Sequence, residues 1–192
     1  MKFKRLNCAL RVMILPSFKY HPDPIATGSI RHSEAECKCC HQQRGYIYVG
    51  PIFSIEELDE RICPWCIADG SAHVKFDVEF TDANGVGGNS KLPVPESVIE
   101  EVAFRTPGFS GWQQEHWLAC CGDAAAFVGR AGWAEIESWW RDAVASIQKD
   151  GGMTDGMEWQ IYLSALNKEG SPTAYIFKCL HCGGHLGYSD CH

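Results

Sequence analysis

Two Cys-x-x-Cys pairs near the start of the chain constrain its fold more than any other feature. They are Cys37 with Cys40, in the segment ECKCCHQ, and Cys63 with Cys66, in the segment CPWC. A structural zinc ion takes four ligands in a tetrahedron, and a Cys-x-x-Cys corner turns two sulfurs toward one point. Two such corners predict one closed zinc site that ties two segments together. The remaining cysteine of the first segment, Cys39, is then a spare thiol, buried or beside the site.

A third corner, Cys179 with Cys182, supplies only two ligands and needs two more from elsewhere. The adjacent pair Cys120 and Cys121 can supply them if the backbone turns there, which Gly122 permits. The sequence therefore predicts a second structural zinc ion. If only one residue of the adjacent pair binds, Cys121 is favoured, and a histidine completes the site. The candidate histidines are His116, His181 and His185.

A redox role is the main rival for CPWC, because a helix N-terminus lowers the pKa of a thiol in thioredoxin-type corners. Those corners follow a strand and begin a long helix. Here a helix is expected before the corner, since Ser54 and Glu57 form a capping-box pattern. The eleven cysteines also cannot all pair in disulfides, because their number is odd. Clustered cysteines in a reducing compartment usually bind metal or carry out redox chemistry, and the position of the expected helix favours metal here.

The pattern of helices and strands predicts an α+β fold. A strand is expected over 45–53, and a short helix begins near Pro95 and ends at Thr106. The clearest helix covers 133–150, and a further helix covers 158–166. The segment 171–190 reads as strand, cysteine corner, strand. Together these elements predict one compact domain with two zinc-ribbon-like cysteine corners.

The chain begins with basic and apolar residues that resemble a signal peptide only superficially. Asn7 and Arg11 interrupt the apolar run, and no small-x-small cleavage site follows it. Residues 1–16 are therefore expected to be an extension, with Met1 or Met13 as the start of translation, and the zinc-binding domain to cover 17–192. No stretch approaches the roughly 18 apolar residues that a membrane span needs, which favours a cytoplasmic protein.

Motifs of common enzymes are missing from the sequence. It contains no G-x-S-x-G, no HExxH and no phosphate-binding glycine loop. The corner CPWC also lacks the proline that precedes the first cysteine in the P-C-x-x-C corner of zinc deaminases, because Arg61 and Ile62 stand there. Because sites made only of cysteine are usually closed and structural, the sequence predicts that the protein is not an enzyme.

The formal net charge is −7, which disfavours general attraction to nucleic acid and suits a basic protein partner. The leading hypothesis is therefore a zinc-binding protein that acts through protein–protein interaction. The alternative is a nucleic-acid-binding or regulatory zinc ribbon. Its basic patch near the first site would consist of Lys19, Arg31, Lys38 and Arg44.

Several long segments resemble the CbrC family of bacterial proteins. They are LPSFKYHPDPIATGSI, the segment from CKCCHQQ to CPWCIADGSA, CCGDAAAFVG and SPTAYIFKCLHCGGHLGYSD. The resemblance covers about Leu15 to Asp190. It implies a link to colicin tolerance, immunity and a stress response, and hence a basic toxin or nuclease domain as partner. It implies no catalytic residue.

Overall fold

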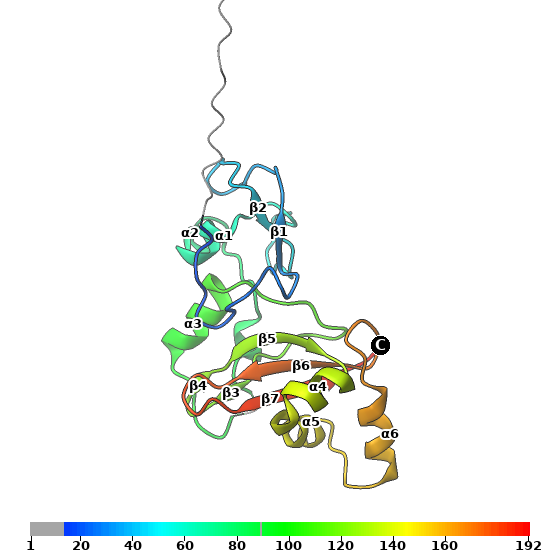
Figure 1. The fold of residues 1–192 in the computed structure, drawn as a ribbon. Coiled ribbons are helices and arrows are strands. Elements are labelled where there is room, and N and C mark those ends of the chain that lie inside the picture. Colours follow the sequence, from blue (N-terminus) through cyan, green and yellow to red (C-terminus); the bar gives the residue numbers. More distant parts are fainter. Residues whose placement is uncertain (1–13, 89) are drawn as a thin grey trace, which may run out of the picture.

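The lower part of the molecule in Figure 1 is built around a three-stranded antiparallel sheet. The computed structural model describes residues 14–88 and 90–192. The strands are β5 (Ala126–Ala131), β6 (Thr173–Lys178) and β7 (His185–Asp190), with β6 in the middle. Strand β6 is buried from Thr173 to Phe177, because both faces of the sheet are covered. Alternate side chains therefore enter two different cores.

One face of the sheet packs against helices. They are α4 (Trp133–Trp139), the 3₁₀ helix η2 (Arg141–Ala143), α5 (Val144–Asp150) and α6 (Met157–Ala165) (Figure 1). Ala174 and Ile176 of β6 face this helical layer, where they join Ile136, Ile147 and Trp159. The predicted helix over 158–166 is confirmed within one residue at each end.

The single helix predicted over 133–150 is wrong, because the chain bends at Trp140 (φ −135°, ψ 35°). The bend brings α5 against the edge strand β7. There, Asp142 accepts the backbone N–H of His185 (2.7 Å), and Ser146 accepts that of Gly187 (2.6 Å). A straight helix could not follow the strand in this way, so contacts with the sheet override the helical pattern of the sequence.

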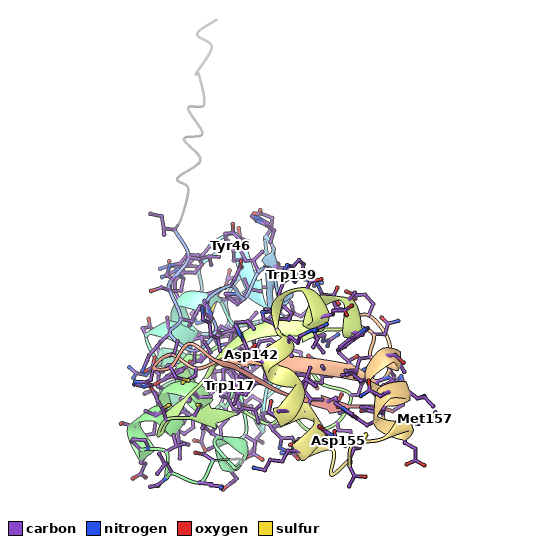
Figure 2. All side chains as sticks on the ribbon, turned by 60° about the horizontal axis from the view of Figure 1, so that its bottom comes forward. Tyr46, Trp117, Trp139, Asp142, Asp155 and Met157 are labelled. Carbon is purple, nitrogen blue, oxygen red and sulfur yellow. The ribbon has the colours of Figure 1, made fainter. Side chains whose placement is uncertain are left out.

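The other face of the sheet packs on an aromatic core that includes Phe109, Trp117, Phe127, Tyr175 and Phe177. Figure 2 labels Trp117, which is fully buried. The rings contact one another closely, as in the Phe109–Phe127 stack with centroids 3.9 Å apart. Such contacts between rings favour one fixed packing of the sheet on the aromatic core.

Residues 17–33, the N-terminal arm, contribute to the core. Phe18 and Tyr20 are buried, and His21 is fully buried. His21 contacts the carbonyl oxygen of Pro107 through Nδ1 (2.7 Å) and the hydroxyl of Thr27 through Nε2 (2.6 Å). A neutral imidazole satisfies both contacts, with Nδ1–H donating and Nε2 accepting. This pairing explains how a histidine can occupy an apolar site.

Apart from one helix of ten residues, the described part of the N-terminal half contains short elements (Figure 1). They are β1 (Ile30–His32), β2 (Tyr46–Tyr48), α1 (Pro64–Ala68), α2 (Ser71–Phe76), the 3₁₀ helix η1 (Ala83–Gly85) and α3 (Glu96–Arg105). The predicted helix that ends at Thr106 is confirmed as α3. The strand predicted over 45–53 is shorter than expected, since only Tyr46–Tyr48 pairs with β1.

The helix expected to start at Ser54 does not form. Lys38 donates its backbone N–H to the carbonyl of Arg61 (2.8 Å), and Tyr48 does the same to Ile62 (2.9 Å). These bonds hold Arg61 and Ile62 beside Lys38 and β2. Just before them, Glu60 is left-handed (φ 54°) and the N–H of Arg61 bonds to the carbonyl of Leu58 (2.9 Å), so the chain makes a tight turn instead of a helix.

The predicted α+β class, with one compact domain and two cysteine clusters, is confirmed. The remaining strands, β3 (Ala119–Cys120) and β4 (Asp123–Ala124), form a small hairpin near one end of the sheet. Among the residues described, none of the helices has the length and apolar character that crossing a membrane requires. Residues 1–13 of the expected extension 1–16, including Met13, lie outside the described residues.

Candidate metal centres

Four cysteines of the N-terminal half converge on one point. This N-terminal cluster consists of Cys37, Cys40, Cys63 and Cys66, whose sulfurs all lie within 4.8 Å of one another. The Sγ–Sγ distances are 3.8 Å for Cys37–Cys66, 3.8 Å for Cys40–Cys63 and 3.6 Å for Cys63–Cys66. A tetrahedron with Zn–S bonds of about 2.3 Å has edges of about 3.8 Å. The spacing of the sulfurs therefore fits a tetrahedral metal ion.

A second group forms at the end of the sheet, where the β6–β7 turn passes beside β3 and β4 (Figure 1). This C-terminal cluster consists of Cys120, Cys121, Cys179 and Cys182, again with all sulfurs within 4.8 Å. Cys120 lies 3.7 Å from Cys121 and 3.9 Å from Cys182, measured between sulfurs. The sulfurs of Cys120 and Cys121 therefore both face the sulfurs of the third corner. Of the alternatives predicted for the second site, the structure contains the one with four cysteines.

The two clusters share one backbone motif, which we call the knuckle: a Cys-x-x-Cys corner with its next residue. His41 donates its N–H to the carbonyl of Cys37 (2.8 Å), and Gly183 donates to Cys179 (3.1 Å) in the same way. In both knuckles the N–H of the first cysteine bonds to the carbonyl oxygen five residues later, at 3.0 and 2.9 Å. The residue after the second cysteine is left-handed in both, with φ of 55° at His41 and 75° at Gly183. The corners at Cys37 and Cys179 are thus the same structure used twice.

The other half of each cluster is built differently. In the N-terminal cluster, Pro64 begins helix α1 between the two cysteines, and Cys63 donates its N–H to the sulfur of Cys37 (3.3 Å). In the C-terminal cluster, Cys121 (φ 57°) and Gly122 (φ 75°) form the two-residue turn between β3 and β4. Positive φ at both positions is typical of a type I′ hairpin turn. Glycine suits this backbone, whereas a cysteine in the left-handed region is strained.

The first sulfur of each knuckle is prepared to be a thiolate. Hydrogen bonds from the thiols of Cys63 and Cys66 lower the pKa of Cys37 far below that of an ordinary thiol. At Cys179, burial opposes ionisation, but bonds from the backbone N–H groups of Cys182 and His181 lower the pKa to about 6. The neighbouring thiol of Cys63 keeps its proton, since donation to Cys37 raises its pKa to about 12. Metal binding would therefore displace protons from the remaining thiols.

Asp123 connects the C-terminal cluster to the N-terminal arm. Its carboxylate accepts hydrogen bonds from the Tyr20 hydroxyl (2.7 Å) and the Lys19 ammonium (3.1 Å), and lies 2.9 Å from His181 Nε2. Burial alone would raise the pKa of Asp123, but these bonds outweigh it and lower the pKa. Because Asp123 follows the turn and His181 lies inside the knuckle, the contact between them fixes the two halves of the cluster together.

None of the three candidate histidines belongs to either group of sulfurs. His181 contacts Asp123, His185 Nδ1 lies 3.2 Å from the Asp142 carboxylate, and His116 packs edge-on against Tyr188. Cys39 is also outside the N-terminal cluster, and its sulfur lies 3.6 Å from the Ser71 hydroxyl. The role of the eight cysteines as ligands stays a prediction, but the structure assembles them as two sets of four.

The basic patch expected near the first site does not assemble. Arg31 pairs with Glu60 and Lys38 with Glu56, which neutralises both cations locally. Lys19 lies instead beside Asp123 at the C-terminal cluster. Arg44 stacks over the ring of Trp65, with 5.3 Å from its guanidinium carbon to the ring centroid. The patch that motivated a nucleic-acid partner is thus split between two regions and largely paired.

Comparison with known proteins identifies relatives along most of the chain. Residues 15–191 match the model of an uncharacterised protein family, UPF0167. UPF0167 protein Mb2317 of Mycobacterium bovis is 49% identical over 181 residues, which is 92% of this chain and 93% of that protein. UPF0167 protein PA1536 of Pseudomonas aeruginosa is 43% identical over 170 residues, or 88% and 93% of the two chains. No solved structure matches the chain.

These matches correct the family expected from the sequence. The matching model and the relatives carry the name UPF0167 rather than CbrC, so the assignment to the CbrC family is wrong. The expected colicin tolerance, immunity and stress response rested on that name and lose their support with it. The argument for metal binding is unaffected, because it rests on the cysteine spacing alone.

Proposed function

The chain belongs to the UPF0167 family, and we propose that it is a non-enzymatic protein that binds two structural zinc ions and acts by contacting a basic protein partner. The observation that carries the zinc part is the repeated spacing of the sulfurs. Five Sγ–Sγ distances in the two clusters lie between 3.6 and 3.9 Å, close to the tetrahedral edge of about 3.8 Å.

Four sulfur ligands in a tetrahedron suit Zn²⁺ or iron and exclude magnesium or calcium, which prefer oxygen. We favour zinc because both clusters close on four cysteines, which is the arrangement of structural zinc sites. The metal would hold the segments together, and each corner would supply two thiolates. Absorption spectroscopy separates the two metals, since a tetrahedral iron–thiolate site is coloured and a zinc site is not.

Metal content tests this proposal directly. We expect two zinc ions per chain by elemental mass spectrometry of the purified full-length protein. Cys40→Ser should lower the content to about one, because it removes a member of the N-terminal cluster. Cys39→Ser is the matched control and should keep two, since Cys39 lies outside both clusters. A metal-free protein with full folding would overturn the zinc proposal.

Helix α6 supports the protein-binding part of the proposal. Its inner residues Trp159 and Leu163 are buried, but Met157 and Ile161, one turn apart on the outside, are 79% and 63% exposed. In Figure 2, Met157 points away from the rest of the molecule at the end of α6. A helix with apolar residues on both faces usually has a partner on each. The flanking acids Asp155 and Glu158, and the net charge of −7, favour a basic partner.

The surface is tested by replacing both apolar residues. The double variant Met157→Ser, Ile161→Ser should lose a partner that co-purifies with the wild-type chain from cells that express it naturally. Its zinc content and thermal unfolding should stay unchanged, because neither side chain is buried. The same double variant retaining every partner would rule out α6 as the contact surface.

The cellular part of the proposal is a reducing compartment such as the cytoplasm. The ten cysteines within the described residues are all free thiols, with no disulfide among them. Metal-binding thiolates survive in such a compartment, whereas an oxidising one would convert them to disulfides.

A further inference from the structure

The two clusters differ most in their contact with solvent. In the N-terminal cluster, Cys37, Cys63 and Cys66 are buried, and the cluster lies inside a hydrophobic core. In the C-terminal cluster, Cys121 and Cys182 are exposed. Reagents that oxidise sulfur need access to a thiolate, and coordination by a metal keeps the sulfur in that form. The C-terminal cluster therefore offers oxidants two accessible sulfurs that the N-terminal cluster lacks.

Resting on the proposed zinc binding, we propose that the C-terminal cluster is a modification site at which a hydroperoxide oxidises Cys121 and a Cys121–Cys182 disulfide forms. Besides its exposure, Cys121 has a strained backbone. Cys121 occupies the tip of the β3–β4 hairpin with φ of 57°, a backbone that costs energy for any residue except glycine. Strain of this kind is concentrated at functional positions.

Geometry selects Cys182 as the second sulfur. Consecutive Cα atoms are about 3.8 Å apart, whereas disulfides normally need about 4.4–6.8 Å, so Cys120 and Cys121 cannot pair easily. Cys179 is buried, although its sulfur also lies within 4.8 Å of that of Cys121. Cys182 is exposed and lies on a different segment, within the same 4.8 Å. It can move toward Cys121 without disturbing the sheet.

The chemistry proceeds in two balanced steps. The Cys121 thiolate attacks the O–O bond of the hydroperoxide, forms an S–O bond and releases an alkoxide that takes a proton from water. The Cys182 thiolate then attacks the sulfur of the resulting sulfenic acid, forms the S–S bond and releases hydroxide. In total, two thiolates lose two electrons, and one hydroperoxide with two protons becomes one alcohol and one water. Two ligands are thereby removed from the metal, which would be released.

The experiment is a hydrogen peroxide titration of the full-length zinc-loaded chain. A background with Cys8, Cys39 and Cys191 replaced by Ser leaves only the eight cluster cysteines. With about one equivalent of peroxide, we expect peptide mapping to find the Cys121–Cys182 disulfide. A chromogenic chelator should then detect about half of the zinc, while the N-terminal cluster stays reduced.

A second variant records the first step separately. In Cys182→Ser, the sulfenic acid has lost its partner, so dimedone should label Cys121. The N-terminal cluster of the same variant keeps all four cysteines and serves as the internal control. Its Cys37, Cys63 and Cys66 should stay unlabelled, because they are buried.

Two outcomes would overturn the proposal. One is oxidation of the N-terminal cluster at the same rate as the C-terminal cluster or faster. The other is a two-zinc protein that consumes no peroxide at Cys121. A chain that carries no metal contradicts the proposed function instead. In that case the same titration of the metal-free chain, read by peptide mapping, still decides whether Cys121 is oxidised first.

Discussion

The N-terminal and C-terminal clusters begin with the same knuckle but lie in regions that differ in what else stabilises them. Three of the twelve buried residues in the N-terminal core are cysteines of the cluster itself. The elements around it are a two-stranded pair and helices of five and six residues. Two-stranded pairs and helices this short are marginal in isolation. We therefore expect the N-terminal region to depend on the proposed metal ion.

The C-terminal cluster lies instead beside a sheet that has a core of its own on each face. No ring of the aromatic core and no residue of the helical core belongs to the cluster. The same four-sulfur arrangement can thus serve as the centre of one region and as an attachment at the edge of another. From this comparison we expect the two proposed metal sites to contribute differently to folding, although both consist of four cysteines.

The largest effect is expected from removing the N-terminal metal. Cys63→Ser, or treatment with a strong chelator, should unfold residues 30–76 while β5, β6 and β7 stay folded. Structural zinc in small finger peptides binds with about 10–16 kcal/mol, so a loss of more than about 5 kcal/mol is reasonable for this region. Hydrogen exchange resolved by peptide measures it. Equal loss of protection in the sheet would contradict the division into two regions.

A smaller effect is expected at the C-terminal cluster. Cys179→Ser should remove one zinc ion and leave the sheet folded, with a loss of about 1–3 kcal/mol in the free energy of unfolding. The cost is lower because the β6–β7 pairing and the two cores remain. Urea unfolding followed by tryptophan fluorescence, together with zinc analysis, provides the measurement. Unfolding of the sheet in this variant would show that the sheet also depends on the C-terminal cluster.

Acid should weaken the packing of the N-terminal arm on the aromatic core through His21, whose ring contacts Trp117 and Phe127. Burial is the main reason that its pKa is lowered from 6.5 to about 4, so the unfolded chain binds a proton more readily than the folded one. Stability is therefore complete above about pH 6.5 and is lost as the pH falls toward 4. Between pH 7.5 and 5.5 this residue alone should cost about 1.3 kcal/mol.

Acid would also release the proposed zinc ions, so His21→Asn is compared with the wild type at both values of pH. The variant should be less stable at pH 7.5 but should lack the extra loss between 7.5 and 5.5. An identical pH dependence in the two proteins would show that His21 does not titrate on unfolding.

The smallest effects are expected from the left-handed residue of each knuckle. Gly183→Ala should cost about 1 kcal/mol from backbone strain alone, because an added Cβ would meet no atom within 4 Å. His41→Gly should gain a similar amount by removing the same strain from the other knuckle. Thermal unfolding of the two variants measures both changes. Effects of equal sign would contradict the shared geometry of the knuckles.

The division of eight cysteines into two groups of four could be predicted from the sequence. Cys-x-x-Cys spacing and a glycine after a cysteine pair determine the direction of the sulfurs through the local backbone alone. Gly122 allowed the turn that aligns Cys120 with Cys121, and the structure contains that turn. The strand, corner, strand plan of the C-terminus was predictable for the same reason, and β6 and β7 are its strands.

Features set by distant contacts were not predictable. The segment expected to form a helix from Ser54 is instead held at both ends by bonds to residues far away in the chain, Phe53 with Glu79 and Ile62 with Tyr48. The break at Trp140 follows from the contacts of Asp142 and Ser146 with β7. The unequal exposure of the clusters also depends on which residues cover them, and no local pattern encodes it.

The bend at Trp140 also has a consequence for the behaviour of the protein in concentrated solution. The exposed edge of a sheet can recruit a strand from another molecule and start aggregation. Asp142 and Ser146 occupy two backbone N–H groups on the outer edge of β7, those of His185 and Gly187. An incoming strand would have to displace both side chains before it could pair. We therefore expect the interrupted helix to reduce the tendency of β7 to pair with a strand of another molecule.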